Sequence, residues 1–418
     1  MPVAVAASGG VDGASVLLVV AVLLVVAKLG GLAATRAGQP AVLGELVAGI
    51  VLGNLAPVLS ASGVAMFASD STIQTLGEIG LLILLFDVGL ESDMRALARA
   101  GASSIAVAVI GVVVPFALGW AAAAWLLPEL TRAGHVFVGA CLTATSVGIT
   151  SRVLKDLRVW QTAEGQTILG AALVDDILGL VILAVVSGSV TSAAPGTTFA
   201  WLDVLIIVAK AAAFLGAAAA AGHYLSGPIV RLVGRTGEPM MMLAVGLALC
   251  LTLAFVADRL GLAGIIGAFA AGIVLDPYGT GVRTPADEQT LSELLQPLGT
   301  VLVPLFFVLM GTQVKLAAFL DGRAAALGFA LVIVGVVGKL VTGLGVIGRG
   351  TRRLAVGIGM VPRGEVGLIF AGVGAGLTVG GEPLLGPDVF PALVAMVLVT
   401  TVITPPALAW VFRGRARP

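Results

Sequence analysis

Long apolar stretches alternate with short groups of charged residues, glycine and proline along the whole chain. Most stretches hold about 20 residues, the length that an α-helix needs to cross a hydrocarbon layer ~30 Å thick. The pattern therefore predicts an all-α polytopic membrane protein with thirteen transmembrane helices. Their expected spans are residues 14–36, 40–57, 72–91, 103–127, 134–154, 165–190, 201–224, 239–257, 260–276, 291–313, 325–347, 353–376 and 388–411.

A weak internal repeat relates the two halves of the chain. The sequence Ala-Gly-Ile-Val-Leu at Ala48–Leu52 recurs in the second half at Ala271–Leu275, and Gly89 recurs as Gly311 at nearly the same offset. This near-constant offset pairs the second to sixth helices with the ninth to thirteenth. Paired helices are seven apart, an odd number, so the two halves cross the membrane in opposite directions. Inverted repeats with a site near the midplane are typical of secondary transporters.

The repeat suggests how the chain is organised. We interpret residues 1–418 as a single membrane domain, because every loop between the predicted spans is too short to form a separate soluble domain. In this interpretation 14–36 is an extra N-terminal helix, 40–190 the first repeat, 201–257 the connecting helices and 260–412 the second repeat.

Composition agrees with a protein surrounded by membrane lipid. Hydrophobic residues make up 59% of the chain and charged residues 11%, whereas soluble domains carry roughly 25% charged residues. Lys plus Arg and Asp plus Glu both total 23, so the net charge gives no information about nucleic acid or other anionic partners. For a membrane protein of this composition we expect no nucleic-acid partner. Cys141 and Cys250 lie within apolar stretches, as packing residues do, and no disulfide is expected.

Basic residues are distributed unevenly between the two sides of the membrane. Fifteen fall at or after the ends of odd-numbered helices, and four on the opposite side. Because Lys and Arg concentrate in cytoplasmic loops, this asymmetry predicts an external N-terminus and a cytoplasmic C-terminus. An incorrect helix count would mix the two sets, so the asymmetry also favours thirteen crossings.

A few charged residues fall inside the apolar stretches. Asp175 and Asp176 stand together in the middle of the 165–190 span, where even one carboxylate costs several kcal/mol by contested estimates. Packing does not require them, but a cation or proton that must reach the bilayer centre would. The other charges well within apolar spans are Glu45, Glu78, Asp87, Lys339, Arg363 and Glu365.

Two predicted helices are interrupted at matching places in the repeat. The fifth contains the polar stretch Thr143–Thr150, and the twelfth contains Pro362-Arg363-Gly364-Glu365. Proline removes a helix hydrogen bond and glycine tolerates unwound backbone. Paired interrupted helices are the best sequence indication of a transport site. Hydroxyls such as those of Thr145 and Ser146, and freed carbonyls, suit a hard cation such as Na⁺.

Structural explanations compete with these functional ones. Thr145 and Ser146 could hydrogen-bond to helix carbonyls, as Ser and Thr often do in membranes. Arg363 and Glu365 could form a structural pair that fixes the broken helix. Glu78 could line a funnel or cap a neighbouring helix. Lys339 requires a counter-charge at this depth, so a carboxylate partner is expected.

The residues together resemble bacterial sodium/proton antiporters of the monovalent cation/proton antiporter superfamily, most closely the NapA-like branch. The resemblance covers Val16 to Trp410 and is carried by Ala172-Leu173-Val174-Asp175-Asp176, Thr143–Thr150, Gly338-Lys339 and Met360–Gly367. It implies two inverted five-helix repeats with crossed broken helices, a dimerisation domain and a mobile core domain that works by elevator-type alternating access.

The resemblance also implies roles for individual residues. Asp176 would bind the cation, as Na⁺, and the proton in turn, and Asp175 would pair with Lys339. The protein would be a homodimer in the bacterial cell (inner) membrane, without a cofactor. The related potassium-efflux branch usually has Gln-Asp and a nucleotide-binding regulatory domain; this chain has Asp-Asp and stops at Pro418, so we expect no such domain.

The leading hypothesis is therefore electrogenic exchange of Na⁺ or Li⁺ for H⁺ by a secondary active transporter rather than an enzyme. Exchange of K⁺ for H⁺ by the same fold stays open, because selectivity depends on small differences in cavity geometry. An intramembrane aspartyl protease needs two facing carboxylates that share a proton, which neighbours on one helix do not provide. A channel would conduct without proton coupling.

Overall fold

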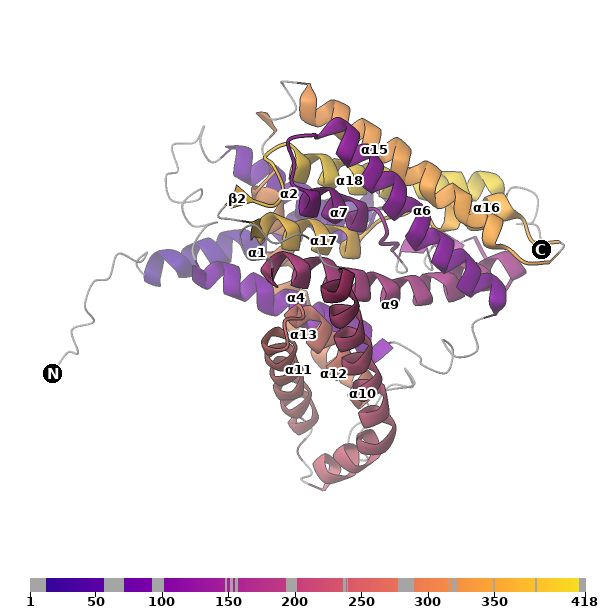
Figure 1. Ribbon diagram of the computed structural model, residues 1–418. Coiled ribbons are helices and arrows are strands. Elements are labelled where there is room, and N and C mark those ends of the chain that lie inside the picture. The colour runs from indigo at the N-terminus through magenta and orange to yellow at the C-terminus, as the bar shows by residue number, and fades with distance from the viewer. Residues whose placement is uncertain are drawn as a thin grey trace. The chain divides into compact units, whose positions relative to one another are not determined.

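The computed structural model describes residues 13–55, 71–91, 101–146, 149–150, 153–154, 157–192, 201–235, 238, 240–276, 289–314, 316–317, 322–348, 350–379 and 382–412. This part of the chain forms fourteen α-helices, one 3₁₀-helix and a short hairpin (Figure 1). In chain order they are α1 (Gly13–Arg36), α2 (Ala41–Leu55), α4 (Ser71–Glu91), α6 (Ala102–Leu126), α7 (Arg132–Cys141), α9 (Ala163–Ser192), α10 (Trp201–Gly234), α11 (Met241–Arg259), α12 (Gly264–Leu275), α13 (Leu291–Thr312), α15 (Arg323–Leu340), η1 (Val341–Gly345), α16 (Arg353–Gly359), α17 (Glu365–Gly376), β1 (Thr378–Val379), β2 (Glu382–Pro383) and α18 (Val389–Val411).

Each of the thirteen predicted spans overlaps at least one of these helices, so the all-α polytopic architecture is confirmed. Among the described residues, nine helices are long and apolar enough to cross a membrane alone. The others are shorter or interrupted, and the count of thirteen crossings stays a prediction. The span predicted over 201–224 is too short, because α10 continues through Pro228 and buries Val233 near its end. The antiparallel hairpin of β1 and β2 was not predicted.

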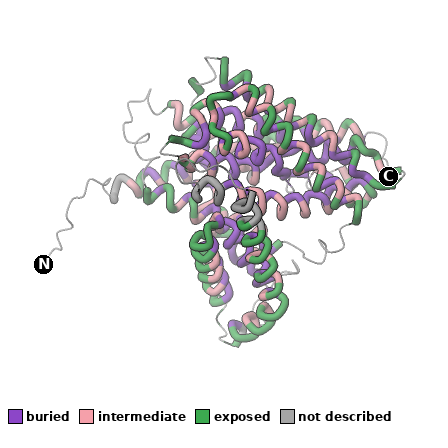
Figure 2. The backbone as a smooth tube through the Cα atoms, viewed as in Figure 1, coloured by how far each residue is buried: buried purple, intermediate pink, exposed green. Residues whose placement is uncertain are grey.

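Both predicted interruptions are present. The fifth span leaves the α-helix after Cys141 and is helical again at Ile149, while the twelfth is broken between α16 and α17. Around them α6 packs against α7, α9 and α15. The outer faces of α6 and α15 expose apolar side chains such as Val113 and Phe329, as a lipid-facing surface does, while buried residues concentrate inside (Figure 2).

The chain divides into two compact units. The first contains Met1–Ile83 and Pro297–Lys315, and the second contains Leu84–Gln296 and Leu316–Pro418. In the first unit α1 and α2 approach so closely that a Cβ added to Gly30 or Gly44 would strike the other residue's carbonyl. A hydrophobic cluster around Leu23, Ile73 and Val308 fills its interior.

Each unit also contains a crossing built from two glycines. In the first unit a Cβ on Gly49 would strike the carbonyl of Val308, and one on Gly311 would strike the carbonyl of Leu46. In the second unit Gly272 approaches the carbonyl of Phe86 in the same way, and Gly89 that of Phe269. The near-constant offset of the repeat converts Gly49 into Gly272 and Gly89 into Gly311. The two crossings are therefore equivalent under the repeat.

Candidate functional site

The paired aspartates lie on neighbouring positions of α9, in the second unit. Side chains that follow one another on a helix point ~100° apart. Asp175 is 1% exposed and faces α15, whereas Asp176 is half-buried. The two carboxylates therefore have different surroundings although they are adjacent in sequence.

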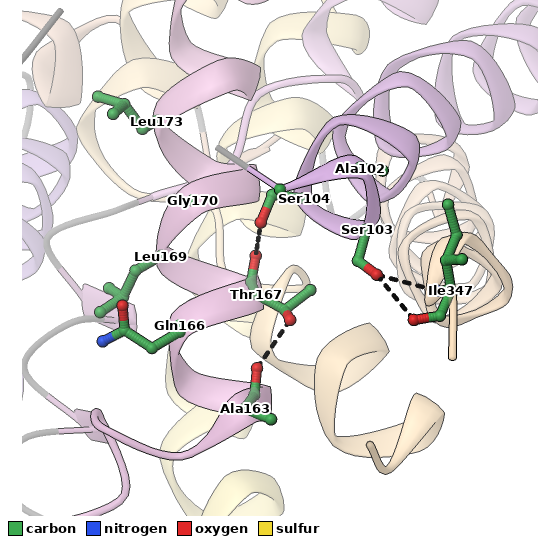
Figure 3. A pocket seen from close by; sticks show the side chains of 11 residues that line it. Ala102, Ser103, Ser104, Ala163, Gln166, Thr167, Leu169, Gly170, Leu173 and Ile347 are labelled. Carbon is green, nitrogen blue, oxygen red and sulfur yellow. Dashed lines mark hydrogen bonds between the residues drawn. The ribbon is translucent and has the colours of Figure 1, made fainter. Parts of the chain in front are cut away.

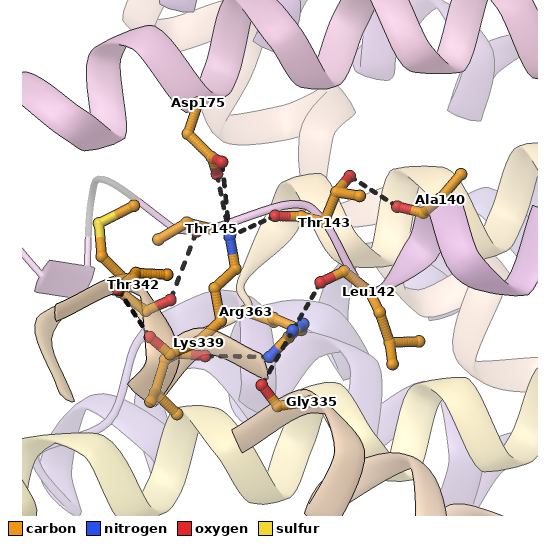
Figure 4. Close-up of polar contacts among 11 residues, drawn as sticks. Ala140, Leu142, Thr143, Thr145, Asp175, Gly335, Lys339, Thr342 and Arg363 are labelled. Atoms are coloured by element: carbon orange, nitrogen blue, oxygen red, sulfur yellow. Dashed lines mark hydrogen bonds and ion pairs between the residues drawn. The ribbon is translucent and has the colours of Figure 1, made fainter. Parts of the chain in front are cut away.

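Lys339, in the last turn of α15, is fully buried and faces Asp175. Its Nζ atom lies 3.4 Å from both carboxylate oxygens of Asp175 and donates a 2.5 Å hydrogen bond to the carbonyl of Thr143 (Figure 4). Gly111 of α6 lies beside this pair, because a Cβ there would be in ordinary van der Waals contact with Nζ, at 3.6 Å. The lysine thus links α15 to α9 and to the first interruption.

The first interruption has its freed carbonyls capped mainly by cationic side chains. Arg363 Nη2 donates to the carbonyl of Leu142 at 2.6 Å, and Lys339 holds the next carbonyl, that of Thr143. The hydroxyl of Thr143 donates back to Ala140 at 2.7 Å. Backbone outside a helix is tolerated at membrane depth only when its polar groups find partners in this way.

The second interruption is capped mainly by hydroxyls and one amide. Thr150 donates to the carbonyl of Gly359 at 2.9 Å, Thr145 to Met360 at 3.4 Å, and the backbone N–H of Ser146 to Pro362 at 2.8 Å. Thr401 of α18 donates to the carbonyl of Arg363. Most of these donors belong to the first interrupted helix, so the two interruptions lie against each other.

The side chain of Arg363 carries a charge and also donates hydrogen bonds to backbone carbonyls. Its fully buried guanidinium donates to the carbonyls of Leu142, Gly335 and Val361. It also acts electrostatically on Asp175, and Asp176 acts on Lys339. When Asp175, Asp176, Lys339 and Arg363 are all ionised, this cluster is formally neutral.

The other residues proposed from sequence are placed as follows. Thr145 and Ser146 are buried beside the second interruption, and the Oγ of Ser146 also accepts from the amide of Ile149 at 3.4 Å. Glu365 begins α17, but its side chain lies outside the described part. Glu78 belongs to the first unit and its side chain is exposed.

Two further carboxylates inside apolar spans lie elsewhere. Glu45 is buried in the first unit next to α1, where a Cβ on Gly31 would lie 3.4 Å from its Oε1. Asp87, in the second unit, accepts a 2.6 Å hydrogen bond from Ser292. Sequence reasoning did not single out Thr150 or Thr401 as partners of the second interruption, since a threonine in a membrane helix ordinarily bonds within its own helix.

A cavity of about 830 Å³ lies between the first turns of α6 and α9 (Figure 3). Its lining residues are uncharged. Ser103 donates to the carbonyl of Ile347 at 3.1 Å and Ser104 to that of Thr167 at 3.3 Å, which ties its walls together. Leu169 and Leu173 line it, and helical spacing puts Asp176 next along the same face of α9.

Comparison with known proteins identifies a related group. Residues 20–414 match the family model described as sodium/hydrogen exchanger, transmembrane. The chain is 36% identical to the high-affinity Na⁺/H⁺ antiporter NhaS3 of Synechocystis sp., over 96% of this chain and 90% of that protein. It is 34% identical to the Na⁺/H⁺-K⁺ antiporter GerN of Bacillus cereus, over 95% and 96% of the two chains.

A solved structure shares the fold. The sodium proton antiporter MjNhaP1 from Methanocaldococcus jannaschii aligns with a TM-score of 0.70 and 16% sequence identity. The alignment covers 96% of this chain and 97% of that one.

Proposed function

Because the chain belongs to the sodium/hydrogen exchanger family, whose members are transporters, we propose that it exchanges Na⁺ or Li⁺ for protons across a bacterial cell membrane. The observation that carries the proposal is the charge-balanced cluster at the two interrupted helices, in which Asp175, Lys339 and Arg363 are buried and Asp176 is half-buried. When Asp176 is protonated the cluster carries one net positive charge, and a cation that entered as well would raise it to two, which is unfavourable in a medium of low dielectric constant. Release of a proton restores the balance, so entry of one ion favours loss of the other.

We assign alternate binding of cation and proton to Asp176. Asp175 is engaged by Lys339, whereas Asp176 points about 100° away from it on the same helix. The hydroxyls of Thr145 and Ser146 lie at the nearby interruption and offer oxygen atoms of the kind that a hard cation prefers. Each is already held by backbone, so ligation of a cation would draw on their remaining lone pairs.

Lys339 would make the exchange electrogenic. If Na⁺ on Asp176 weakens the pair between Asp175 and Lys339, the lysine releases its proton as the metal binds. Two protons then exchange for one Na⁺, one from Asp176 and one from Lys339. Measurement of current during a Na⁺ concentration jump on a supported membrane tests this assignment directly.

The family and the distribution of basic residues support a dimeric, elevator-type transporter with an external N-terminus and a cytoplasmic C-terminus. In this orientation the cavity between α6 and α9 is on the cytoplasmic side, and we place cytoplasmic access to Asp176 there. A cysteine at Ser103, with Cys141 and Cys250 replaced by alanine, should react with an impermeant thiol reagent from the cytoplasmic side of everted vesicles. Reaction from outside in sealed cells would refute the orientation.

The decisive experiment compares the parent protein with Asp176→Asn in proteoliposomes. Internal pH is followed when Na⁺, Li⁺ or K⁺ is added outside, with and without a clamp on the membrane potential. The parent should move protons in response to a cation, and Asp176→Asn should not, while staying folded because Asp176 is only half-buried and asparagine has nearly the same shape. Asp388→Asn, a change at the N-cap of α18, is the matched control and should keep exchange. Near-normal exchange by Asp176→Asn would eliminate the assignment.

Exchange of K⁺ for H⁺ is the second candidate. The Bacillus cereus relative is named as a Na⁺/H⁺-K⁺ antiporter, which favours testing this ion. In the same assay a response to K⁺ equal to that for Na⁺ would establish it. Cation flux that persists without any proton movement would instead indicate a channel.

A further inference from the structure

Three buried threonines of α18 use their hydroxyls in two different ways. Thr400 and Thr404 donate to carbonyls of their own helix, at Met396 (2.8 Å) and Thr400 (2.6 Å), which is the ordinary arrangement in membrane helices. Thr401 lies between them and donates to the carbonyl of Arg363 on another segment. None of the three is more than 1% exposed. Of the three, only the Thr401 hydroxyl therefore forms a hydrogen bond between segments.

Thr150 makes a corresponding contact at the other end of the second interruption. Its hydroxyl donates to the carbonyl of Gly359, the last residue of α16, at 2.9 Å. The interruption is thus held at its start by the first repeat and at its end by α18. Both carbonyls are freed from helical bonding, and at membrane depth each needs a donor from elsewhere.

A chain of contacts leads from Thr401 to the ion-pair cluster. Thr401 holds the backbone of Arg363, whose guanidinium holds the carbonyl of Leu142. The next carbonyl, that of Thr143, is held by Lys339, which lies 3.4 Å from Asp175. Movement of the Arg363 backbone therefore moves the donor on which the first interruption depends.

We propose that Thr401 and Thr150 are positioning residues for cation binding. They fix the backbone of the second interruption and, through Arg363 and Lys339, the place of the Asp175 carboxylate beside Asp176. The proposal rests on the cation exchange proposed above. It assigns a role in affinity to hydroxyls that belong to neither the aspartate pair nor its counter-charges.

The test replaces one hydroxyl at a time by a methyl group of similar shape. Thr401→Val removes the contact to Arg363, and Thr404→Val is the matched control because it removes a hydroxyl equally buried on the same helix. In proteoliposomes the apparent KM for Na⁺ and Li⁺ should rise about threefold or more in Thr401→Val and in Thr150→Val. Thr404→Val should stay near the parent, and Thr401→Ser, which keeps the hydroxyl, should restore the parent value.

A purely structural role would give a different result. Thr401→Val would then yield less folded protein or a lower maximal rate, while its apparent KM and the pH dependence of its rate matched those of Thr404→Val, and the proposal would be wrong. If Thr401→Val cannot be recovered folded, the apparent KM of Thr150→Val tests the proposal by the same criterion. Failure of the parent itself to move protons with any cation would overturn the proposed function instead.

Discussion

In the first interruption Arg363 and Lys339 cap the carbonyls of Leu142 and Thr143, whereas in the second the caps come from hydroxyls and one amide. A hydrogen bond from a charged donor is roughly twice as strong as a neutral one, and it changes when the donor gains or loses a proton. A hydroxyl of threonine does not titrate. The first interruption is thus capped by charged groups of the site, whereas the donors that cap the second carry no charge of their own.

Each interruption also receives hydrogen-bond donors from the other half of the chain. The second half of the chain provides Lys339 and Arg363, which complete the first interruption, and the first half provides Thr145, Ser146 and Thr150 to complete the second. Neither interrupted helix satisfies its own backbone alone. This dependence explains how two irregular segments persist at a depth where free carbonyls are strongly disfavoured.

The largest effect is expected from Lys339→Gln, which removes both the cap on Thr143 and the partner of Asp175. An uncompensated buried charge costs about 3–5 kcal/mol of unfolding free energy, measurable by denaturant titration in detergent. Exchange should be lost or become slower and electroneutral. The double variant Asp175→Asn/Lys339→Gln should be more stable than Lys339→Gln alone, because no lone charge remains.

The net charge moved per transport cycle shows whether Lys339 carries a proton or has only a structural role. If Lys339→Gln still carries current during a Na⁺ jump like the parent, the lysine is not the second proton carrier. Its contribution would then be confined to the carbonyl of Thr143 and the pair with Asp175.

A smaller effect is expected from Arg363→Lys, which keeps the charge but not the planar set of donors. Loss of the bonds to Leu142, Gly335 and Val361 should lower the unfolding free energy by about 1–3 kcal/mol. Arg323→Lys is the control: Arg323 is an exposed arginine paired with Glu129, and its replacement should cost under ~1 kcal/mol. Equal losses in the two variants would show that the fork of Arg363 is not what holds the first interruption.

The smallest change in stability is expected from Thr145→Ala and Ser146→Ala, about 1 kcal/mol or less each. Their effect should appear instead as weaker apparent affinity for Na⁺, since both residues belong to the interruption whose Thr143 carbonyl is held by Lys339, the partner of Asp175. Rates measured over a range of Na⁺ concentrations provide the test. Unchanged cation dependence in both variants would leave these hydroxyls with a role in backbone capping only.

The sequence predicted most of the helices, both interruptions and the pair of Asp175 with Lys339, but not the other contacts among the elements. The length of the apolar stretches predicted the helices, and glycine, proline and clustered hydroxyl residues predicted both interruptions. The carbonyls that Lys339 and Arg363 cap could not be read in the same way, because they depend on how segments from opposite halves of the chain cross. Thr401 was missed for a related reason: like Thr400 and Thr404 it lies in an apolar helix, and only the direction of its side chain on α18 brings it to another segment.

The two glycine crossings give a physical reason for part of the short sequence that the two halves of the chain share. Gly49 with Gly311, and Gly272 with Gly89, lie where any side chain would strike a neighbouring backbone. The halves differ in chemistry, since Asp175 and Asp176 belong to one and Lys339 and Arg363 to the other. At the four glycines no side chain can be added unless the backbone shifts. The short sequence shared by the halves therefore includes positions that the closest approach of two backbones restricts to glycine.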